Sequence, residues 1–517
     1  MQPRKERTQH ISSREMRALE VNAEYFGITL LQLMENAGRN VAAEAASRCS
    51  KDQKIVVFCG LGGNGGDGFV AARHLTAMGY KVAAVILAGK SKDIAHPAAL
   101  QNFCALKALR ESIPIHEVAD GSELPAVDAE IVIDALLGTG TKGKLKPPIA
   151  QLAKYLNSLP AFKLAVDAPT GIDSDTGEVL GMAVKANVTV TFHKAKVGLE
   201  KAKKHVGELI VKDIGLPNEF ESYAGPGDVL LVTKPRLPSA HKGDFGRLLV
   251  IGGSEVFSGA PALVSLAALR TGVDLAYLAA PAKTATAISS MSPDLITLKL
   301  DGDHLNPKNM AALKQYVKMV DAVALGPGLG LHSETKGFVK TCVTAVENAG
   351  KALLLDADGL KAFAEFRRPL KVPFVLTPHA GEYMVLTGRK LPEGLAERIA
   401  EVQRTAAKLN AVILLKGQMD VICDGKRAKV NFTGNAGMTV GGTGDVLSGV
   451  VGAFLAQKAD PFEAAVAGAF VNGAAGDLVA DEIGYHMVAS DLIKRIPNVL
   501  NDPVSYLKVR KPSASGA

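Results

Sequence analysis

Short aliphatic runs alternate with longer helical segments along most of this chain, and that rhythm leaves few folds open. In the first half the runs are residues 55–58, 82–87, 131–133, 164–166, 188–191 and 209–211. In the second half they are residues 248–251, 275–278, 322–325, 352–355, 374–376 and 412–415. This order predicts doubly wound, mostly parallel sheets with helices on both faces and ligand sites at the carboxyl ends of the strands.

One segment interrupts the rhythm and predicts a domain boundary. Residues 217–240 concentrate proline, glycine and polar side chains, as connections between domains often do. A length of 517 residues accommodates about two to four domains. We therefore expect two α/β domains with three α/β/α layers each, residues 1–225 and 226–517. A short strand is expected inside the connecting segment, at residues 229–232.

The composition excludes several classes of protein. Hydrophobic residues make up 47% of the chain and charged residues 21%, which suits buried cores and argues against extensive disorder. The net charge of +7, from 59 basic and 52 acidic residues, is too dilute for a nucleic-acid binder. No run approaches the length of a membrane span, and the apolar stretch at 464–476, which Asn472 interrupts, predicts a buried helix.

The N-terminal segment and the cysteines predict a cytoplasmic protein. The segment MQPRKERTQH lacks the apolar stretch of a signal peptide. Ser12 and Glu15 then have the spacing of a capping box, and the apolar residues that follow predict two helices. The five cysteines are far apart and form no Cys-x-x-Cys pair, so we expect reduced thiols and neither disulfides nor zinc.

The run GLGGNGGDGFVAARHL at residues 60–75 follows a predicted strand and opens a helix. Three of its glycines fit the G-x-G-x-x-G pattern of dinucleotide sites. However, the end of the next strand, at residues 87–90, carries no acid to hold a ribose, while Asn64 and Asp67 add polar groups to the turn. The run therefore indicates a loop for phosphate or another polar ligand, and a purely structural turn is the alternative.

Two later strands end in acids, Asp134 and Asp167. Each acid alone could merely cap the next helix. Together with Asn64 and Thr170, however, Asp134 offers the amide, carboxylate and hydroxyl oxygens that suit a monovalent or divalent cation. Residues 138–144 add backbone amides and two lysines that could bind phosphate.

The runs GNGGDG, DALLGTG and DAPTGIDSDTG follow one another at residues 63–68, 134–140 and 167–177. With this combination, residues 11–225 resemble the NAD(P)H-hydrate epimerase family, which implies a Rossmann-like domain. The resemblance implies potassium ligands at Asn64, Asp134 and Thr170. It implies substrate contacts at Gly63, Asn64, Gly65, Gly66, Asp67, Gly138, Thr139, Gly140, Thr141, Lys142, Gly143, Lys144 and Asp167. Gly63 and Thr170 replace the family's usual Asn and Ser, so the hydroxyl is kept but a possible substrate contact is lost.

Epimerisation of the hydrate expels hydroxide and adds water back to the other face of the ring, so an acid/base group must reach that oxygen. Asp167 is the candidate for this role. Lys196 could hold its charge or bind phosphate, or it could belong to a solvated lysine-rich face between His193 and His205.

A glycine loop opens an apolar helix in the second half, in the run NFTGNAGMTVGGTGDVLSGVVGAFLA at residues 431–456. Residues 441–444 can aim backbone amides at one anion, with the positive end of the helix behind them. A carboxylate beside a phosphate is repelled by it, so Asp445 is interpreted as the base of a phosphoryl transfer rather than only a helix cap.

This loop resembles the ribokinase superfamily, and five further motifs narrow the resemblance. KGDFGRLLVIGGS, GPGLG, LDADGL and TPHAGE begin at residues 242, 326, 355 and 377. Together with SGAPALVSLAALRTG at residues 258–272, they make residues 240–500 similar to the ADP/ATP-dependent NAD(P)H-hydrate dehydratases. The resemblance implies substrate contacts at Ala260, Gly328, His379 and Asp445. It implies nucleotide contacts at Lys416, Gly417, Gln418, Met419, Asp420, Gly441, Gly442, Thr443 and Gly444. Asp420 departs from the small hydroxyl residue expected at its position.

Both resemblances imply one function, the repair of hydrated nicotinamide nucleotides. The first domain would interconvert the R and S forms of NADHX and NADPHX with potassium bound. The second would dehydrate the S form with ADP, or alternatively ATP, and magnesium. We also expect a homo-oligomer without nucleic-acid or membrane partners. The alternative is a small-molecule kinase of the ribokinase superfamily with a binding or scaffolding N-terminal domain.

Overall fold

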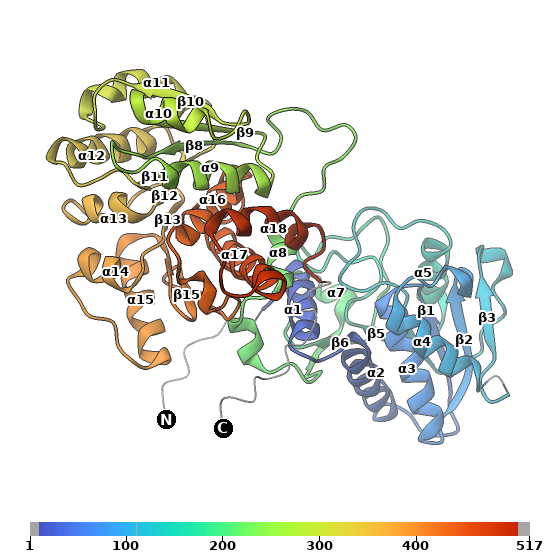
Figure 1. Cartoon of the computed structure of the whole chain (residues 1–517). Coiled ribbons are helices and arrows are strands. Elements are labelled where there is room, and N and C mark those ends of the chain that lie inside the picture. Colours follow the sequence, from blue (N-terminus) through green and yellow to red (C-terminus); the bar gives the residue numbers. More distant parts are fainter. Residues whose placement is uncertain (1–9, 110, 505–517) are drawn as a thin grey trace. The chain divides into compact units, whose positions relative to one another are not determined.

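The computed structural model describes residues 10–109 and 111–504, so most of the basic N-terminal segment lies outside the described residues. Contacts between residues divide the chain into two compact units, which meet in sequence between Asn218 and Glu219 (Figure 1). The boundary expected between residues 225 and 226 lies slightly further along the chain and stays a prediction. Both units are α/β structures with a largely parallel sheet, which confirms the predicted fold class.

The sheet of the first unit has seven strands in the order β3-β2-β1-β4-β5-β6-β7, and neighbouring strands are parallel. The strands are β1 Lys54–Cys59, β2 Lys81–Ala88, β3 Ile115–Val118, β4 Ile131–Ala135, β5 Phe162–Val166, β6 Val188–Phe192 and β7 Glu208–Lys212. The chain winds outward from β1 to β3 and then returns to the other side of β1. The carboxyl ends of β1 and β4 therefore flank the point where the winding reverses, which is where such sheets bind ligands.

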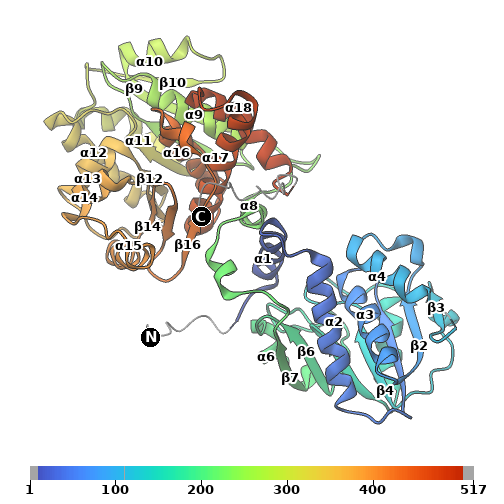
Figure 2. The same cartoon turned by 60° about the horizontal axis from the view of Figure 1, so that its bottom comes forward.

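Helices cover both faces of this sheet. Helices α2 Leu30–Ala46, α3 Gly63–Ala77 and α4 Pro97–Lys107 lie together on one face (Figure 2). Helix α5 Ile149–Ser158 packs on the other face, against a core that includes Phe58 and Val132. The remaining helices are α1 Ser13–Tyr25, α6 Val197–Lys201 and α7 Lys203–Val206, with short 3-10 turns at Ser91–Asp93 and Gly121–Glu123. The two predicted N-terminal helices are thus confirmed, and so is the capping box between Ser12 and Glu15.

The sheet of the second unit has nine strands in the order β10-β9-β8-β11-β12-β13-β14-β15-β16. The strands are β8 Arg247–Ile251, β9 Leu275–Pro281, β10 Ile296–Leu300, β11 Ala322–Leu325, β12 Ala352–Leu355, β13 Phe374–Leu376, β14 Val412–Leu415, β15 Asp420–Cys423 and β16 Ala428–Asn431. The strands from β10 to β14 are parallel, whereas β15 and β16 join the edge antiparallel. Here the winding reverses between β8 and β11.

The helices of the second unit also form two layers. Helices α11 Met310–Met319, α12 Ser333–Asn348, α13 Ala357–Ala364, α14 Ala380–Thr387 and α15 Leu395–Leu409 pack on one face. The opposite face carries α9 Gly259–Thr271, α10 Ala282–Ser289, α16 Thr443–Ala456 and α17 Pro461–Ile483, and α18 Ala489–Asn501 packs against α9 and α17. Short 3-10 turns lie at Asn218–Ser222, Pro307–Asn309 and Ala436–Thr439. Helix α17 contains the stretch predicted as a buried helix, and its residues from Ala464 to Gly476 are buried.

The strand expected at residues 229–232 is wrong, because these residues belong to helix α8 Pro226–Val232. Proline suits the first turn of a helix, and the backbone N–H of Gly225 donates to Asp228 Oδ2 at 2.9 Å to cap it. Val229 and Val232 are both buried, a spacing of three that turns them to one side of a helix. The apolar side of α8 packs against α17.

The structure bears on the state of the cysteines and on the presence of membrane-spanning helices. All five cysteines are free thiols, and Cys59, Cys342 and Cys423 are buried. Within residues 10–109 and 111–504, no helix combines the length and the apolar character that crossing a bilayer requires.

Candidate functional site

The polar residues predicted in the first half gather where the sheet of the first unit changes its winding direction. Asn64 lies in the first turn of α3, directly after β1, and Asp134 lies at the end of β4. Asp167 and Thr170 follow β5, the next strand in the sheet. Parallel neighbours end at the same edge of a sheet, so three chain segments contribute to one candidate site.

Asp134 and Thr170 are in direct contact. The hydroxyl of Thr170 donates to Asp134 Oδ1 at 2.7 Å, and its backbone N–H donates to Oδ2 at 2.9 Å. Both residues are almost completely buried. Burial raises the pKa of Asp134 to about 6, and the hydrogen bonds from Thr170 and Leu136 offset that rise only in part. Among the described residues no lysine or arginine forms an ion pair with Asp134, so this carboxylate lacks a compensating positive charge.

Asn64 lies in the same region, at the carboxyl end of β1, the strand next to β4. A side chain at Gly138 would place its Cβ only 2.8 Å from Asn64 Oδ1, so the amide lies directly against this glycine. The Nδ2 atom of Asn64 is buried and has no hydrogen-bond partner among the described residues. An unpartnered polar atom in a buried site is costly unless a ligand or ion completes it. The neighbouring residues Gly63, Gly65, Gly66 and Asp67 lie in the first two turns of α3 rather than in an open loop.

Asp167 and Lys196 form a buried ion pair. Lys196 Nζ lies 2.7 Å from Asp167 Oδ1 and also donates to Thr191 Oγ1 at 2.9 Å and to the carbonyl of Phe192 at 3.1 Å. Its side chain is only 1% exposed, which contradicts the alternative of a solvated lysine face and supports a role in holding the charge of Asp167. Burial opposes ionisation of Asp167, but Lys196 and hydrogen bonds from Thr139 and Thr191 lower its pKa below the ordinary value.

Two further carboxyl groups share the electrostatic environment of Asp167. Glu20, on α1, has its pKa raised to about 7, first by burial and then by the charge of Asp167. Asp67, in α3, has its pKa raised well above the ordinary value by burial and by the charges of Asp167 and Glu20. Lys196 offsets both effects only in part. The first site therefore combines a carboxylate whose charge Lys196 stabilises with two carboxyl groups whose burial favours the protonated form.

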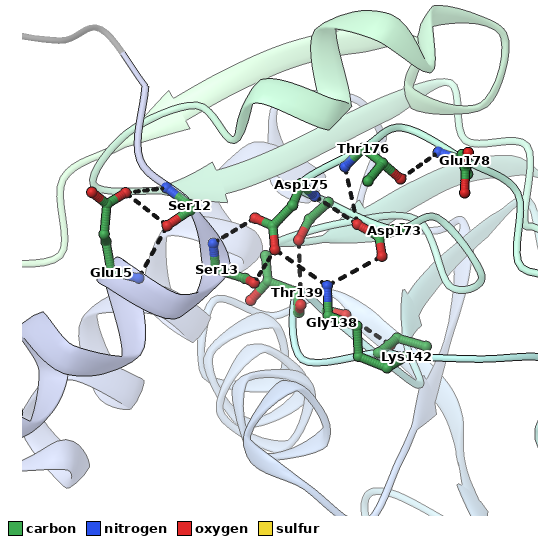
Figure 3. Close-up of polar contacts among 12 residues, drawn as sticks. Ser12, Ser13, Glu15, Gly138, Thr139, Lys142, Asp173, Asp175, Thr176 and Glu178 are labelled. Carbon is green, nitrogen blue, oxygen red and sulfur yellow. Dashed lines mark hydrogen bonds and ion pairs between the residues drawn. The ribbon is translucent and has the colours of Figure 1, made fainter. Parts of the chain in front are cut away.

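The loop at residues 138–144 runs from this site to the surface. Its inner end carries Thr139, whose side chain hydrogen-bonds to Asp167. Further along, Lys142 Nζ contacts Asp173 Oδ2 at 3.1 Å and Asp175 Oδ2 at 3.2 Å (Figure 3). Gly140 and Gly143 have open space where a side chain would begin, Thr141 donates to the carbonyl of Gly138 at 2.8 Å, and Lys144 is exposed.

The second candidate site lies at the carboxyl edge of the second sheet. Gly328 follows β11 and Ala260 lies at the start of α9, on the two sides of this sheet's switch point. Gly328 has a φ of 68°, and a Cβ there would lie 3.4 Å from the Cβ of Ala260 and 2.9 Å from that of Phe257. The glycine thus permits a close approach of the two segments that larger residues would prevent.

The glycine loop leads into the N-terminus of α16, as the sequence indicates. Gly442 is the N-cap residue and has a φ of 98°, a conformation that favours glycine. Asp477 holds the start of the loop by accepting hydrogen bonds from Gly434 N at 3.1 Å and Asn435 Nδ2 at 2.9 Å. The hydroxyl of Thr443 donates to the carbonyl of Met438 at 2.9 Å. First-turn N–H groups lack helical partners, so this arrangement is suited to an anion.

Asp445 lies in the first turn of α16, within the electrostatic field of a buried ion pair. Lys416, directly after β14, contacts Asp356 Oδ1 at 2.8 Å, and Ser448 donates to Asp356 Oδ2 at 2.7 Å. A Cβ at Gly444 would lie 3.3 Å from Lys416 Nζ, so this ammonium group lies beside the helix start. Burial raises the pKa of Asp445 to about 7, Asp356 and Glu382 add to the rise, and Lys416 opposes it.

The remaining predicted residues of the second half lie around this centre. His379 caps α14: its Nδ1 accepts from Gly381 N at 3.0 Å and from Glu382 N at 3.3 Å. The side chain is 58% exposed, so it can be reached from solvent. Gly417, Gln418 and Met419 form the turn between β14 and β15. Asp420 accepts hydrogen bonds from Gly417 N at 3.1 Å and Asn431 Nδ2 at 3.0 Å, and burial raises its pKa to about 6.

Several charged residues around these sites were not selected from the sequence. Asp356 and Glu382 lie inside the LDADGL and TPHAGE motifs, so the motifs carried a signal for them. Asp173 and Asp175 likewise lie inside DAPTGIDSDTG. Glu20 had no such signal, because an acid on an amphipathic helix usually faces water.

Comparisons with known proteins agree for both halves. A family model described as NAD(P)H-hydrate dehydratase matches residues 248–498, and one described as YjeF-related protein N-terminus matches residues 30–198. The bifunctional NAD(P)H-hydrate repair enzyme Nnr of Pyrobaculum aerophilum is 47% identical over 500 residues, covering 95% of this chain and 98% of the relative. The enzyme of that name from Archaeoglobus fulgidus is 45% identical over 491 residues, covering 95% and 98%.

A solved structure matches part of the chain. The ADP/ATP-dependent NAD(P)H-hydrate dehydratase of Bacillus subtilis, co-crystallised with ATP and Mg²⁺, is 28% identical and covers 53% of this chain and 95% of its own, with a TM-score of 0.46.

Taken with the two sites, the family models and the two relatives define a two-domain α/β enzyme whose second half matches the NAD(P)H-hydrate dehydratases. The chain belongs to the family of bifunctional NAD(P)H-hydrate repair enzymes. Membership extends over nearly the whole chain, which confirms both resemblances and disfavours the alternative of a small-molecule kinase with a scaffolding domain.

Proposed function

We propose that this protein repairs hydrated NADH and NADPH with two activities in one chain. The first unit interconverts the R and S forms of NADHX and NADPHX, and the second dehydrates the S form with ADP, giving AMP and phosphate. The observation that carries the proposal is that a chain matching the repair family almost from end to end keeps charged groups at both candidate sites. Epimerisation would make the entire damaged pool accessible to a dehydratase that accepts one epimer.

The first site can divide the acid and base roles of epimerisation. Loss of the ring hydroxyl as water requires a proton, while the ring nitrogen supplies the electron pair that expels it. Asp167 is held ionised by Lys196, so it is suited to accept a proton from the water that adds to the opposite face. A carboxyl group that is protonated near pH 7 supplies the first proton, and Glu20 and Asp67 have the raised pKa values that this role needs.

The residues predicted as potassium ligands fit such an ion. Asn64, Asp134 and Thr170 offer amide, carboxylate and hydroxyl oxygens, the hard donors that alkali and alkaline-earth cations prefer. The buried charge of Asp134 favours a bound cation. The unpartnered Nδ2 of Asn64 is a donor, so it would serve an acceptor atom of the substrate, and only the Oδ1 of this amide could face the cation. When bound, potassium would supply a positive charge near the anionic substrate. Lys142 and Lys144, on the adjoining loop, would face the substrate's phosphates.

The second site can activate the hydroxyl of the hydrate for phosphorylation. Asp445, with a pKa of about 7, takes the hydroxyl proton as the oxygen attacks the terminal phosphoryl group of ADP. The amides of residues 441–444 and the start of α16 hold that group, and Lys416 adds positive charge beside Gly444. Phosphate then leaves as the ring nitrogen donates its electron pair. Loss of a proton from the adjacent ring carbon to water or to the departing phosphate then re-forms the ring double bond of the reduced nicotinamide. Magnesium accompanies the nucleotide.

The proposal is tested by incubating the full chain with a mixture of R- and S-NADHX, magnesium, and either ADP or ATP, with and without potassium. Complete recovery of the absorbance of reduced nicotinamide with one nucleotide is the expected result and identifies the phosphoryl donor. Recovery that stops near the S fraction would contradict the epimerase half of the proposal. No recovery with either nucleotide would favour a kinase that acts on another alcohol.

A further inference from the structure

Asp175 connects three segments of the first unit that are far apart in sequence. Its Oδ1 accepts from the backbone N–H of Ser13 at 2.7 Å, and its Oδ2 accepts from the Ser13 hydroxyl at 2.5 Å. The same Oδ2 lies 3.2 Å from Lys142 Nζ. Figure 3 shows Ser13 and Lys142 converging on Asp175 from the first helix and from the loop at 138–144. Burial opposes ionisation, but these donors hold the pKa of Asp175 below its ordinary value.

The contact with Ser13 anchors the beginning of α1. Ser13 is the first residue of this helix, where N–H groups need acceptors and a negative charge is favoured by the helix dipole. The chain just before it is tied to the region of Lys196, because Ile11 N donates to the carbonyl of Ala195 at 3.0 Å. Helix α1 also carries Glu20, whose pKa responds to the charge of Asp167. Asp175 thus fixes the helix that brings a carboxyl group toward Asp167.

The contact with Lys142 orients the loop predicted to bind the substrate. Asp173 holds the other side of this ammonium group at 3.1 Å and is itself fixed by the backbone N–H groups of Asp175, at 2.9 Å, and Thr176, at 3.0 Å. The hydroxyl of Ser174, between the two acids, donates to the carbonyl of Thr139 at 3.3 Å. The segment 173–176 therefore braces both the outer and the inner part of the loop at 138–144.

An ion pair of this kind contributes little to folding. The Lys142 side chain is 60% exposed, and exposed ion pairs add little net stability. Two carboxylates instead hold one exposed lysine on a loop that is expected to bind phosphates, and this arrangement suits a role in orienting that lysine. A cationic side chain that is already oriented loses less conformational freedom when the ligand binds.

We propose that Asp175 is a positioning residue of the epimerase site, which aligns Lys142 for the phosphates of the hydrate while it fixes the start of α1. This inference rests on the proposed epimerase function and extends it to a residue that does not touch the reacting atoms. An asparagine at this position keeps Oδ1 as an acceptor for the N–H of Ser13, so α1 stays anchored, but it loses the charge that holds Lys142. Because Lys142 would contact the phosphates rather than the ring, this substitution should weaken substrate binding more than it slows the chemical step.

The test uses the full chain with R-NADHX and potassium but without ADP or ATP, so that dehydration does not follow. The R-to-S ratio is measured by chromatography at several substrate concentrations. For Asp175→Asn we expect KM to rise about tenfold while kcat changes less than about twofold. The matched control is Glu178→Gln, which alters an exposed acid of the same segment. Figure 3 shows Glu178 bonded to Thr176 through its backbone N–H, and within the described part of the chain its side chain forms no hydrogen bond or ion pair, so both constants should stay at the wild-type values.

A double-mutant cycle identifies the route of the effect. If Asp175 acts through Lys142, the variant with both Asp175→Asn and Lys142→Ala should have the same KM as Lys142→Ala alone. Independent, multiplying effects, or an unchanged KM in Asp175→Asn, would overturn the inference. If Asp175→Asn loses its cooperative unfolding transition, Ser13→Ala replaces it: a KM raised about two- to threefold supports the role, and a wild-type KM refutes it. A wild-type protein that does not interconvert the epimers would instead refute the proposed function.

Discussion

Replacing Asp445 by asparagine should stabilise the second unit while it abolishes most of the dehydratase activity. Asp445 is a partly buried acid whose charge is opposed by burial and by Asp356 and Glu382, and only partly supported by Lys416. Such a carboxylate is useful as a base because its pKa lies near the working pH, but the folded state must accommodate its charge. Asparagine has nearly the same shape and never carries that charge.

The magnitude follows from the pKa of Asp445, which rises from an ordinary value of 3.8 to about 7. Each unit corresponds to about 1.36 kcal/mol, so the cost at high pH is at most about 4 kcal/mol, and we take about 2 to 4 kcal/mol because the group is partly exposed and coupled to its neighbours. The sign follows from the direction of the shift. The cost is absent below the unfolded-state pKa, grows as the pH rises, and is complete above the folded-state pKa.

Differential scanning calorimetry of the full chain can measure this effect, since the protein has no tryptophan for fluorescence. For a unit of this size about 1 kcal/mol shifts Tm by roughly 2 °C, so Asp445→Asn should raise the Tm of the second unit by about 4 to 8 °C at pH 8.5 and by less than half of that at pH 5. The transition of the second unit is identified by its shift on addition of ADP. Dehydration of S-NADHX should fall about 10²- to 10⁴-fold.

A surface acid of α17 provides the matched control. Asp481→Asn should change neither Tm nor activity, because this residue is exposed and, within residues 111–504, its side chain forms no hydrogen bond or ion pair. A lowered Tm for Asp445→Asn at pH 8.5, or a shift of the same size at both pH values, would refute the reasoning that the charge of Asp445 destabilises the folded state.

Three further predictions concern the first unit. Lys196→Met should lower the free energy of unfolding by about 3 to 5 kcal/mol, because Asp167 is then buried without its cation, and adding Asp167→Asn should recover part of the loss in thermal unfolding. Asp134→Asn should make the epimerisation rate independent of potassium concentration, which a titration with KCl checks against the wild type. Wild-type epimerisation should slow as the pH rises above about 7, as Glu20 loses its proton; in Glu20→Gln the rate should be lower by about 10²-fold or more, and a pH profile that keeps the same alkaline limb would rule out this role.

Local sequence predicted most of the strands of both sheets, and it selected polar residues that the fold brings together at two candidate sites. Most of the aliphatic runs became buried strands, because a parallel strand covered on both faces must be apolar throughout. The run at residues 209–211 belongs to the edge strand β7 and stays partly exposed. Asp134, Asp167 and Asp445 could be selected because each directly follows or ends a strand, or follows a glycine loop, and the parallel topology brings such positions to one edge. The acidic residues of the candidate sites could therefore be found from the short sequence segments that contain them.

Features that depend on contacts between distant parts of the chain could not be predicted from the sequence. β15 and β16 are short, carry polar residues at their ends, and are held mainly by pairing with each other and with β14. Val229–Val232 has the β-branched and aliphatic composition of a strand, but Pro226, the cap at Asp228 and packing on α17 favour a helix. The burial of Lys196 could not be inferred from a segment rich in lysine, because only the folded chain places Asp167 and Thr191 around its ammonium group.

The central claim is that one chain both epimerises and dehydrates the hydrate, and pure R-NADHX tests it most directly. With potassium, magnesium and ADP, we predict that the absorbance of reduced nicotinamide recovers completely, because the first unit converts R to S and the second consumes S. With Asp167→Ala the same protein should still dehydrate S-NADHX but recover no absorbance from R-NADHX above the rate without protein. A wild-type chain that restores NADH from the S form but not from the R form would contradict the claim.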